Sequence, residues 1–214
     1  MNEQSLISNF QSWSFSLIII FIVLIFLLFL FYIFLIWWRN RDREQKSLDY
    51  VLLQVAVPFD NESKVDVAEQ MFASLYSLKK GGFLSFLKLQ PHIVFEIVAK
   101  YEDIRFYVSV PKNLQDMVEK QINGAYPDAE VIEVPEYNLF SGNGRVAFAE
   151  LELKESNYKP IKLFKDLPTD SLSSLTTFLG KMGEEEGAAV QIIISPADRK
   201  WQSDGYNYIA GVKK

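Results

Sequence analysis

Few side chains in this sequence have the types and spacing that catalysis or metal binding requires. His92 is the only histidine and the chain has no cysteine, which excludes a paired-histidine metal motif and a cysteine nucleophile. A serine–histidine–aspartate triad would have to use His92, which is expected at the end of a strand beside Pro91. We therefore interpret His92 as a structural residue.

Three other groups of residues could carry chemistry, and each has a simpler interpretation. Gly142–Gly144 lacks the strand and helix that a phosphate-binding loop needs on either side. Glu184–Glu186 lies between two glycines after a predicted helix, which favours a solvated turn over a metal site. Glu96 and Glu150 would support acid–base chemistry only if they met in one cleft. We expect no catalytic residue, no metal site and no cofactor.

Polar side chains gather on one face of three predicted strands. Gln54 lies in the first of these strands and Glu96 in the second, while Arg105 and Tyr107 lie in the third. Because side chains alternate along a strand, all four fall on the face opposite the apolar one. Such a mixed face is either wet or covered by a partner. We interpret it as a candidate partner face.

Nucleic acid is not an expected partner of this face. Arg105-Phe106-Tyr107 distantly resembles an RNA-recognition strand, but the glycine-bearing pattern of those strands is missing. The chain has 22 basic and 27 acidic residues, and the part from residue 47 onward carries a net charge of −6. An acidic domain is a poor general binder of polyanions.

The elements that must position this face follow one another in the order βαββαβ. Runs with a period of two predict four strands, at residues 50–57, 92–99, 104–110 and 129–134. Apolar residues at helical spacing predict a helix that ends before Gly81, with Ser63 and Asp66 placed like a capping box, and a second helix that opens at Pro111. The order predicts an α+β fold with a ferredoxin-like βαββαβ unit over residues 49–135.

Residues 136–200 are expected to form a second α+β unit that packs on the first. The pattern predicts a strand, a helix and a strand, at residues 145–154, 172–182 and 188–195. This order corresponds to a partial βαβ unit, half of another such motif. The C-terminal tail at residues 201–214 has no predicted structure.

The N-terminal part contains one long apolar run, at residues 17–38. Its 22 residues include no charge, amide or proline, and as a helix they would span about 33 Å, enough to cross a bilayer. A cleaved signal peptide would need a basic start, a shorter apolar region and a small-residue cleavage site, which this run lacks. We predict a single transmembrane helix that serves as an anchor.

The residues that flank this run predict how it sits in the membrane. Trp13, Trp37 and Trp38 are placed where interfacial aromatic belts lie. A basic juxtamembrane linker at residues 39–48 follows, and its cations can contact anionic lipid headgroups: Arg39, Arg41, Arg43 and Lys46. Because every Lys and Arg lies after the run, we expect residues 1–16 outside the cytoplasm and the C-terminal domain inside.

Part of the sequence resembles a known group of proteins. FEIVAKYEDIRFYVSVPKNLQDMVEKQINGAYPDAEV at residues 95–131, preceded by AEQMFASLYSL at residues 68–78, resembles an uncharacterised bacterial domain family. Its members typically follow one N-terminal membrane helix. The resemblance covers most of residues 48–202. It implies a bacterial inner-membrane protein encoded beside, or fused ahead of, ATPases similar to those of type IV secretion and conjugation.

These observations together give two hypotheses for the function. The first is a non-enzymatic, membrane-anchored scaffold or assembly subunit of a type IV secretion- or conjugation-like complex. Its partners would be the lipid bilayer, an ATPase or other envelope-complex subunits, and further copies of itself in a homo-oligomer. The alternative is a membrane-tethered sensory module whose mixed face binds a small ligand or nucleic acid.

Overall fold

The computed structural model describes the chain in six stretches, at residues 3–41, 49–79, 81–82, 90–140, 144–170 and 172–212. The chain divides into two compact units, one made of residues 1–48 and 80–89 and the other of residues 49–79 and 90–214. Three residues singled out from the sequence lie outside the described stretches: Arg43, Lys46 and Gly142.

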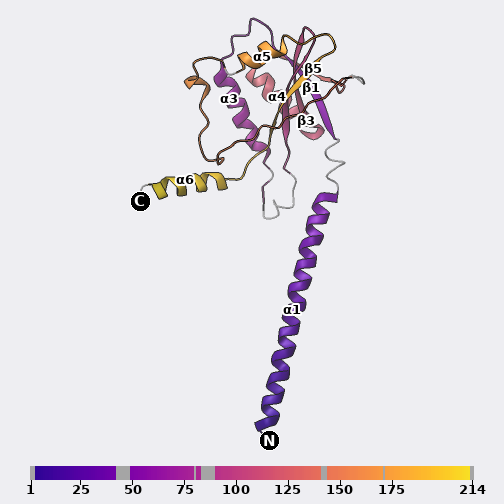
Figure 1. The fold of residues 1–214 in the computed structure, drawn as a ribbon, viewed down its shortest axis with the longest axis vertical. Helices are drawn as coiled ribbons and strands as arrows, with labels where there is room; N and C mark the ends of the chain where they lie inside the picture. Colours follow the sequence, from indigo (N-terminus) through magenta and orange to yellow (C-terminus); the bar gives the residue numbers. More distant parts are fainter. Residues whose placement is uncertain are drawn as a thin grey trace. The chain divides into compact units, whose positions relative to one another are not determined.

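The first unit contains α1, an uninterrupted helix at Glu3–Arg41 (Figure 1). Among the described helices, it alone is long and apolar enough to cross a membrane, over Phe15–Arg41. The apolar stretch is not buried against any other part of the chain. A helix with these properties near the N-terminus is compatible with a membrane anchor and with a signal sequence.

The second unit is built on a five-stranded antiparallel sheet with the strand order β4-β1-β3-β2-β5. The strands are β1 (Tyr50–Ala56), β2 (Ile93–Lys100), β3 (Asp103–Pro111), β4 (Glu130–Val134) and β5 (Gly187–Ile194). All five were predicted to within one residue at each end, and the α+β class is confirmed.

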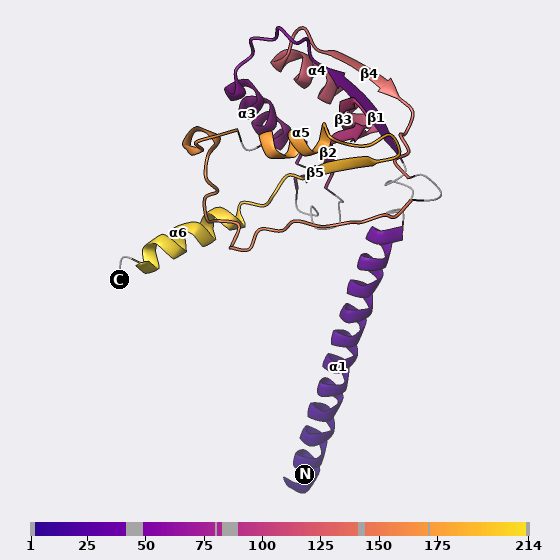
Figure 2. The same cartoon turned by 45° about the horizontal axis from the view of Figure 1, so that its top comes forward.

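Two helices cover one face of this sheet, as Figure 2 shows. They are α3 (Val65–Ser74), which follows β1, and α4 (Gln115–Ala125), which follows β3. Shorter helical turns are η1 (Leu75–Leu78), η3 (Lys112–Leu114) and η4 (Phe164–Asp166). The remaining helices are α5 (Ser173–Leu179) before β5, and α6 (Lys200–Val212) after it, in the tail that had no predicted structure.

The hydrophobic core lies between these two helices and the sheet. Leu53 of β1, Ile93 of β2 and Val110 of β3 are each at most 1% exposed. They point to the same face because side chains alternate along each strand and the register aligns the strands. Val118 and Ile122 of α4 pack against these strand residues and complete the core on the helical side. Full burial of each such side chain contributes about 1.5–3 kcal/mol.

The capping box predicted at the start of α3 does not form. The helix begins at Val65, and its N-cap residue is Lys64, which makes no side-chain capping hydrogen bond. Ser63 therefore precedes the N-cap position, and its backbone N–H donates to Oδ1 of Asn61 at 3.0 Å. Asn61 thus holds the turn before the helix, a role that asparagine side chains often take.

The strand predicted at residues 145–154 is also wrong. This segment has no regular secondary structure, and Phe148 and Leu151 are 88% and 96% exposed. A strand needs a neighbouring strand to satisfy its backbone groups, and β5 pairs with β2 instead of with this segment. The second predicted βαβ unit is therefore a helix and an edge strand that extend the first sheet.

Replacing Leu53 by alanine is expected to lower the free energy of unfolding by about 2–5 kcal/mol, because it leaves a cavity in the core. Leu151→Ala removes the same atoms from an exposed side chain and should change the free energy by less than about 0.5 kcal/mol. Denaturant unfolding of the full chain in detergent measures both. Equal effects of the two substitutions would contradict this core.

Candidate functional site

A row of polar side chains crosses the sheet on the face opposite α3 and α4. The register aligns Gln54 with Tyr107, and Tyr107 with Glu96. Glu96 is aligned in turn with Gln191 of β5. Arg105 lies on the same face, two residues from Tyr107, and its Nη1 donates to Oε1 of Gln54 at 3.5 Å. The register therefore brings together the four side chains predicted as a candidate partner face, and adds Gln191.

Glu96 is the buried centre of this row, with 6% of its surface exposed. Its carboxylate accepts a hydrogen bond from the hydroxyl of Tyr137 and another from Nε2 of Gln191, the latter at 3.2 Å. A buried carboxylate needs such donors, because its transfer from water without them costs several kcal/mol. Glu96, Tyr137 and Gln191 are called the Glu96 cluster below.

Tyr137 covers the middle of the polar row. It lies in the segment after β4, and its ring stacks on that of Tyr107 with 5.2 Å between centroids. Tyr107 is itself buried, together with Leu52 and Val98. The face around Glu96 is therefore closed by the chain's own segment, while Arg105 stays half exposed at the margin. Partner binding to this face remains a prediction.

Burial and neighbouring groups raise the pKa of two residues on this face, Tyr137 and Arg105. Burial away from water raises the pKa of Tyr137 above its usual value, and the hydrogen bond to Glu96 raises it further. The hydroxyl therefore remains a donor to Glu96 at neutral pH. Asp103, whose Oδ2 lies 2.8 Å from Nε of Arg105, raises the pKa of that guanidinium, which stays charged.

A polar pocket of about 440 Å³ lies beside the Glu96 cluster. Glu96, Glu136 and the hydroxyl-bearing Ser109 are among the residues that line it. Glu133 also borders the pocket, but its side chain lies on the opposite face of the sheet, where Nε2 of Gln115 donates to its Oε2 at 3.0 Å. The described part of the chain contains no cluster of three acidic or histidine side chains placed to hold a metal ion. The pocket suits a small ligand that donates hydrogen bonds or carries positive charge.

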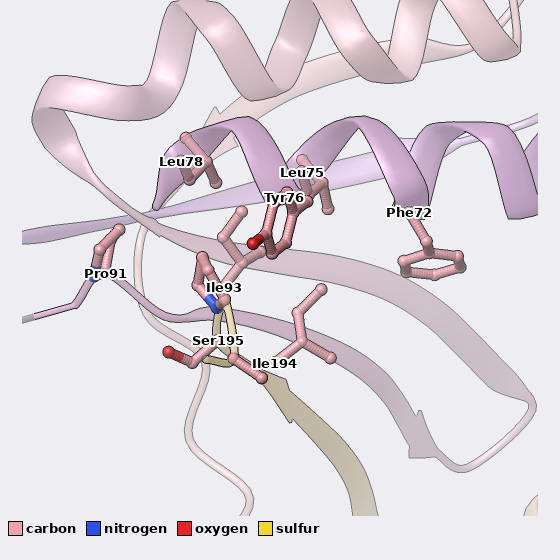
Figure 3. A pocket seen from close by; sticks show the side chains of 10 residues that line it. Phe72, Leu75, Tyr76, Leu78, Pro91, Ile93, Ile194 and Ser195 are labelled. Carbon is pink, nitrogen blue, oxygen red and sulfur yellow. The ribbon is translucent and has the colours of Figure 1, made fainter. Parts of the chain in front are cut away.

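A second, apolar pocket of about 340 Å³ lies between the end of α3 and the ends of β2 and β5. Figure 3 shows Phe72 and Tyr76 projecting from the helical side towards Ile93 and Ile194 on the strands. The ring of Phe72 also packs edge-on against Phe95, with 4.9 Å between centroids. This lining offers shape and apolar contact for a ligand or for a side chain of another protein, and its polar side-chain groups are the hydroxyls of Tyr76 and Ser195.

The other residues that the sequence suggested for catalysis or metal binding make local structural contacts. The hydroxyl of Tyr50 lies 3.0 Å from Nδ1 of His92, and their rings pack with 4.9 Å between centroids. Oε2 of Glu186 accepts the backbone N–H of Gly183 at 2.9 Å, which closes the turn after α5. Glu150 is exposed in the irregular segment, whereas Glu96 is buried on the sheet.

The predicted membrane-interface residues that are described lie towards the two ends of the apolar stretch of α1. Trp13 precedes this stretch, whereas Trp37 and Trp38 end it, and all three are exposed. At 1.5 Å per residue, the helix separates Trp13 from Trp37 by about 36 Å. Arg39 and Arg41 lie in the last turn of the helix. Contact of these residues with lipid remains a prediction.

Tyr137 and Gln191 were not predicted from the sequence. Tyr137 lies in a turn-rich stretch without periodicity, so no pattern marks it. Gln191 is the one polar side chain in the otherwise apolar run of β5, and that position could have indicated a buried polar partner.

The fold and these sites define a class of protein with one apolar N-terminal helix and an α+β domain on a five-stranded antiparallel sheet. Residues 43–210 match the family described as Domain of unknown function (DUF8128), and since this is more than half of the sequence, the chain belongs to that family. Neither a search of curated proteins nor a search of solved structures gave a match.

Tyr137→Phe is expected to lower the free energy of unfolding by about 1–3 kcal/mol, because it removes one of the two donors to the buried carboxylate of Glu96. Tyr206→Phe removes a hydroxyl from an exposed ring of α6 and serves as the matched control, with an expected change below about 0.5 kcal/mol. Denaturant unfolding in detergent measures the difference. Similar values for the two variants would show that the bond to Glu96 does not stabilise the fold.

The contribution of Tyr137 should also depend on pH. Its pKa is raised in the folded state, so the folded protein holds this proton more tightly than the unfolded chain does. The resulting stability is fully present below the unfolded value of about 10 and is lost as pH rises beyond it. The stability difference between the natural protein and Tyr137→Phe should therefore be constant from pH 7 to 9 and shrink above pH 10. A difference that grows there would contradict this assignment.

Proposed function

We propose that the protein is a non-enzymatic, membrane-anchored interaction subunit whose C-terminal domain docks on a partner protein. The observation that supports this most is the exposed apolar surface of the described residues between β4 and α5, at residue 140 and residues 144–164, here called the apolar segment. Its large hydrophobic side chains are exposed to water: Phe140, Val146, Phe148, Leu151, Leu153, Ile161, Leu163 and Phe164. Exposed apolar surface on this scale is typical of a protein interaction site.

Membrane anchoring is supported by α1. Its apolar side chains from Leu17 to Phe34 are all exposed, and none of that stretch is buried by the rest of the chain. Only a bilayer or another apolar partner would remove such a surface from water. Every Lys and Arg lies after the apolar run at residues 17–38, so the positive-inside rule supports a cytoplasmic C-terminal domain. The sequence resemblance supports a bacterial inner membrane.

The proposed architecture of the domain is a ferredoxin-like unit with one added strand. Four strands in the order β4-β1-β3-β2, together with the chain order βαββαβ and two helices on one face, support this assignment. β5 would then be an addition beside β2. Because a fold of this kind serves many functions, the functional argument depends on the exposed surfaces and not on the topology.

The partner we propose is an ATPase similar to those of type IV secretion and conjugation, or another subunit of the same envelope complex. The sequence resemblance supports this choice of partner. Anchoring also favours assembly, because a domain held at one membrane surface meets other membrane-bound subunits at a raised effective concentration. The subunit would then act as a scaffold that holds the ATPase at the cytoplasmic face.

A second candidate function is a membrane-tethered sensor of a small cationic ligand. The polar pocket beside the Glu96 cluster supports it, because two carboxylate-bearing residues, Glu96 and Glu136, line a space of about 440 Å³. The same carboxylates disfavour nucleic acid as the ligand. Thermal-shift screening of the full chain in detergent tests this function, since a ligand that binds the folded state raises the unfolding temperature.

The interaction proposal predicts that Phe148→Ser combined with Leu151→Ser abolishes capture of the partner without destabilising the domain. Both side chains are almost fully exposed, so their replacement removes apolar contact surface and no core packing. Phe59→Ser is the matched control, because Phe59 is also fully exposed but lies in the turn before α3. Affinity purification from detergent-solubilised membranes, followed by mass spectrometry, measures the captured proteins.

The natural protein and Phe59→Ser are expected to co-purify an ATPase or another envelope-complex subunit, and the double variant is expected to lose it at least tenfold. Two results would contradict the proposal. One is that no such protein co-purifies with the natural chain. The other is that the double variant captures it as well as the control does.

A further inference from the structure

β5 is an outer strand of the sheet, and no strand of the described residues pairs with its outer edge. It pairs with β2 on one side, and the strand order ends with it. Its eight residues include no charge and no proline, and Ile192 and Ile193 are 55% and 66% exposed. A long, uncharged edge of this kind readily adds another strand, because its backbone N–H and C=O groups lack partners.

The opposite edge of the same sheet is protected. β4 has only five residues, and it carries Glu130 and Glu133. Pro135 follows directly and cannot donate a backbone hydrogen bond. Short length, charge and proline are the features that keep natural edge strands from pairing. The contrast indicates that the β5 edge, and not the β4 edge, is the one suited to pair with another strand.

The sequence of β5, GAAVQIII, is complementary to itself in an antiparallel pair. If two copies align about Gln191, the small half of one strand lies opposite the large half of the other. The pairs are Ala188 with Ile194, Ala189 with Ile193, and Val190 with Ile192. Each pair lies on one face of the sheet, so every isoleucine has a smaller neighbour across the strands and the side chains fill the space without overlap.

The apolar segment of the same chain is less suited to this edge. It follows Leu139, which packs beside Gly187 at the start of β5, and it reaches α6 beyond the end of β5, where Tyr158 packs on Tyr208 with 5.4 Å between ring centroids. It therefore runs in the same direction as β5, as Figure 2 also shows. Every ladder of this sheet is antiparallel, and no backbone hydrogen bond joins residues 145–154 to the described chain.

We propose that two copies of this chain associate through β5, so that their sheets join edge to edge across a two-fold axis at Gln191. This is the self-complementary interface that a symmetric dimer requires. The Gln191 side chains of the two copies would meet on the face of the Glu96 cluster, where each already donates to Glu96 of its own chain. The dimer is independent of the ATPase partner and leaves the apolar segment of each copy available to it.

Disulfide cross-linking tests the register directly, because the natural sequence has no cysteine. Ala189→Cys and Ile193→Cys are made in two differently tagged full chains, which are expressed together and oxidised in isolated membranes. In the proposed dimer these positions lie directly opposite, with Cα atoms about 4.5–5.5 Å apart, within the range of a disulfide. We expect cross-linked dimers of the mixed pair. Each variant alone should give few, because its own two copies lie more than about 13 Å apart.

The control lies on the protected edge. Ile132→Cys is at the centre of β4, is also exposed and should give no cross-link. The proposal would be overturned if the mixed pair formed no more cross-linked dimer than Ile132→Cys does. An intrachain disulfide in Ala149→Cys combined with Ile193→Cys would also overturn it, because the chain's own segment would then occupy the edge.

A charge at the two-fold axis gives a second test. Gln191→Lys would place two ammonium groups opposite each other, and it should lower the dimeric fraction, measured by light scattering in mild detergent, at least tenfold. Gln191→Met also removes the side-chain amide but adds no charge, so this variant should retain the dimer. Loss of the dimer in both variants, or in neither, would contradict pairing about Gln191. If Gln191→Lys loses the dimer but still captures the ATPase, the dimer and the proposed function are shown to be separate. A failure of one proposal can then be told apart from a failure of the other.

Discussion

Glu96 has a buried carboxylate on one face of the sheet. The arrangement of the domain follows from the hydrogen-bond donors that this group requires. The two donors come from distant parts of the chain, Tyr137 after β4 and Gln191 in β5. Their hydrogen bonds hold the segment after β4 across the face of β3 and β2, and they align β5 beside β2. The chain then passes Gly187 at Leu139 and leaves the sheet as the apolar segment.

The apolar side chains of the protein are partly buried on the two faces of the sheet and partly exposed to water. One face of the sheet is covered by α3 and α4 and forms the core. The other face is closed around the Glu96 cluster by the chain itself. The apolar surface that stays exposed lies on α1, on the apolar segment and along the edge of β5. We assign these three surfaces to the bilayer, to a partner protein and to a second copy of the chain.

The sequence predicted the features that depend on local patterns. The five strands could be predicted because alternation in runs rich in Val and Ile marks half-buried strands, and the same alternation put Gln54, Glu96, Arg105 and Tyr107 on one face. The register that joins Glu96 to Gln191 involves residues 95 positions apart, which no local pattern reveals. Alternation also predicted a strand at residues 145–154, because the pattern reports apolar faces but not whether a sheet edge is available to pair with them.

The central claim is that this is a membrane-bound assembly subunit, and the mass of the particle that it forms in the membrane tests it most directly. The natural chain, released from membranes with a mild detergent and without cross-linking, would be weighed by native mass spectrometry. The account predicts a particle that contains two copies of the chain together with a second protein. A particle with the mass of one chain, or recovery of the chain in the soluble fraction without detergent, would contradict it.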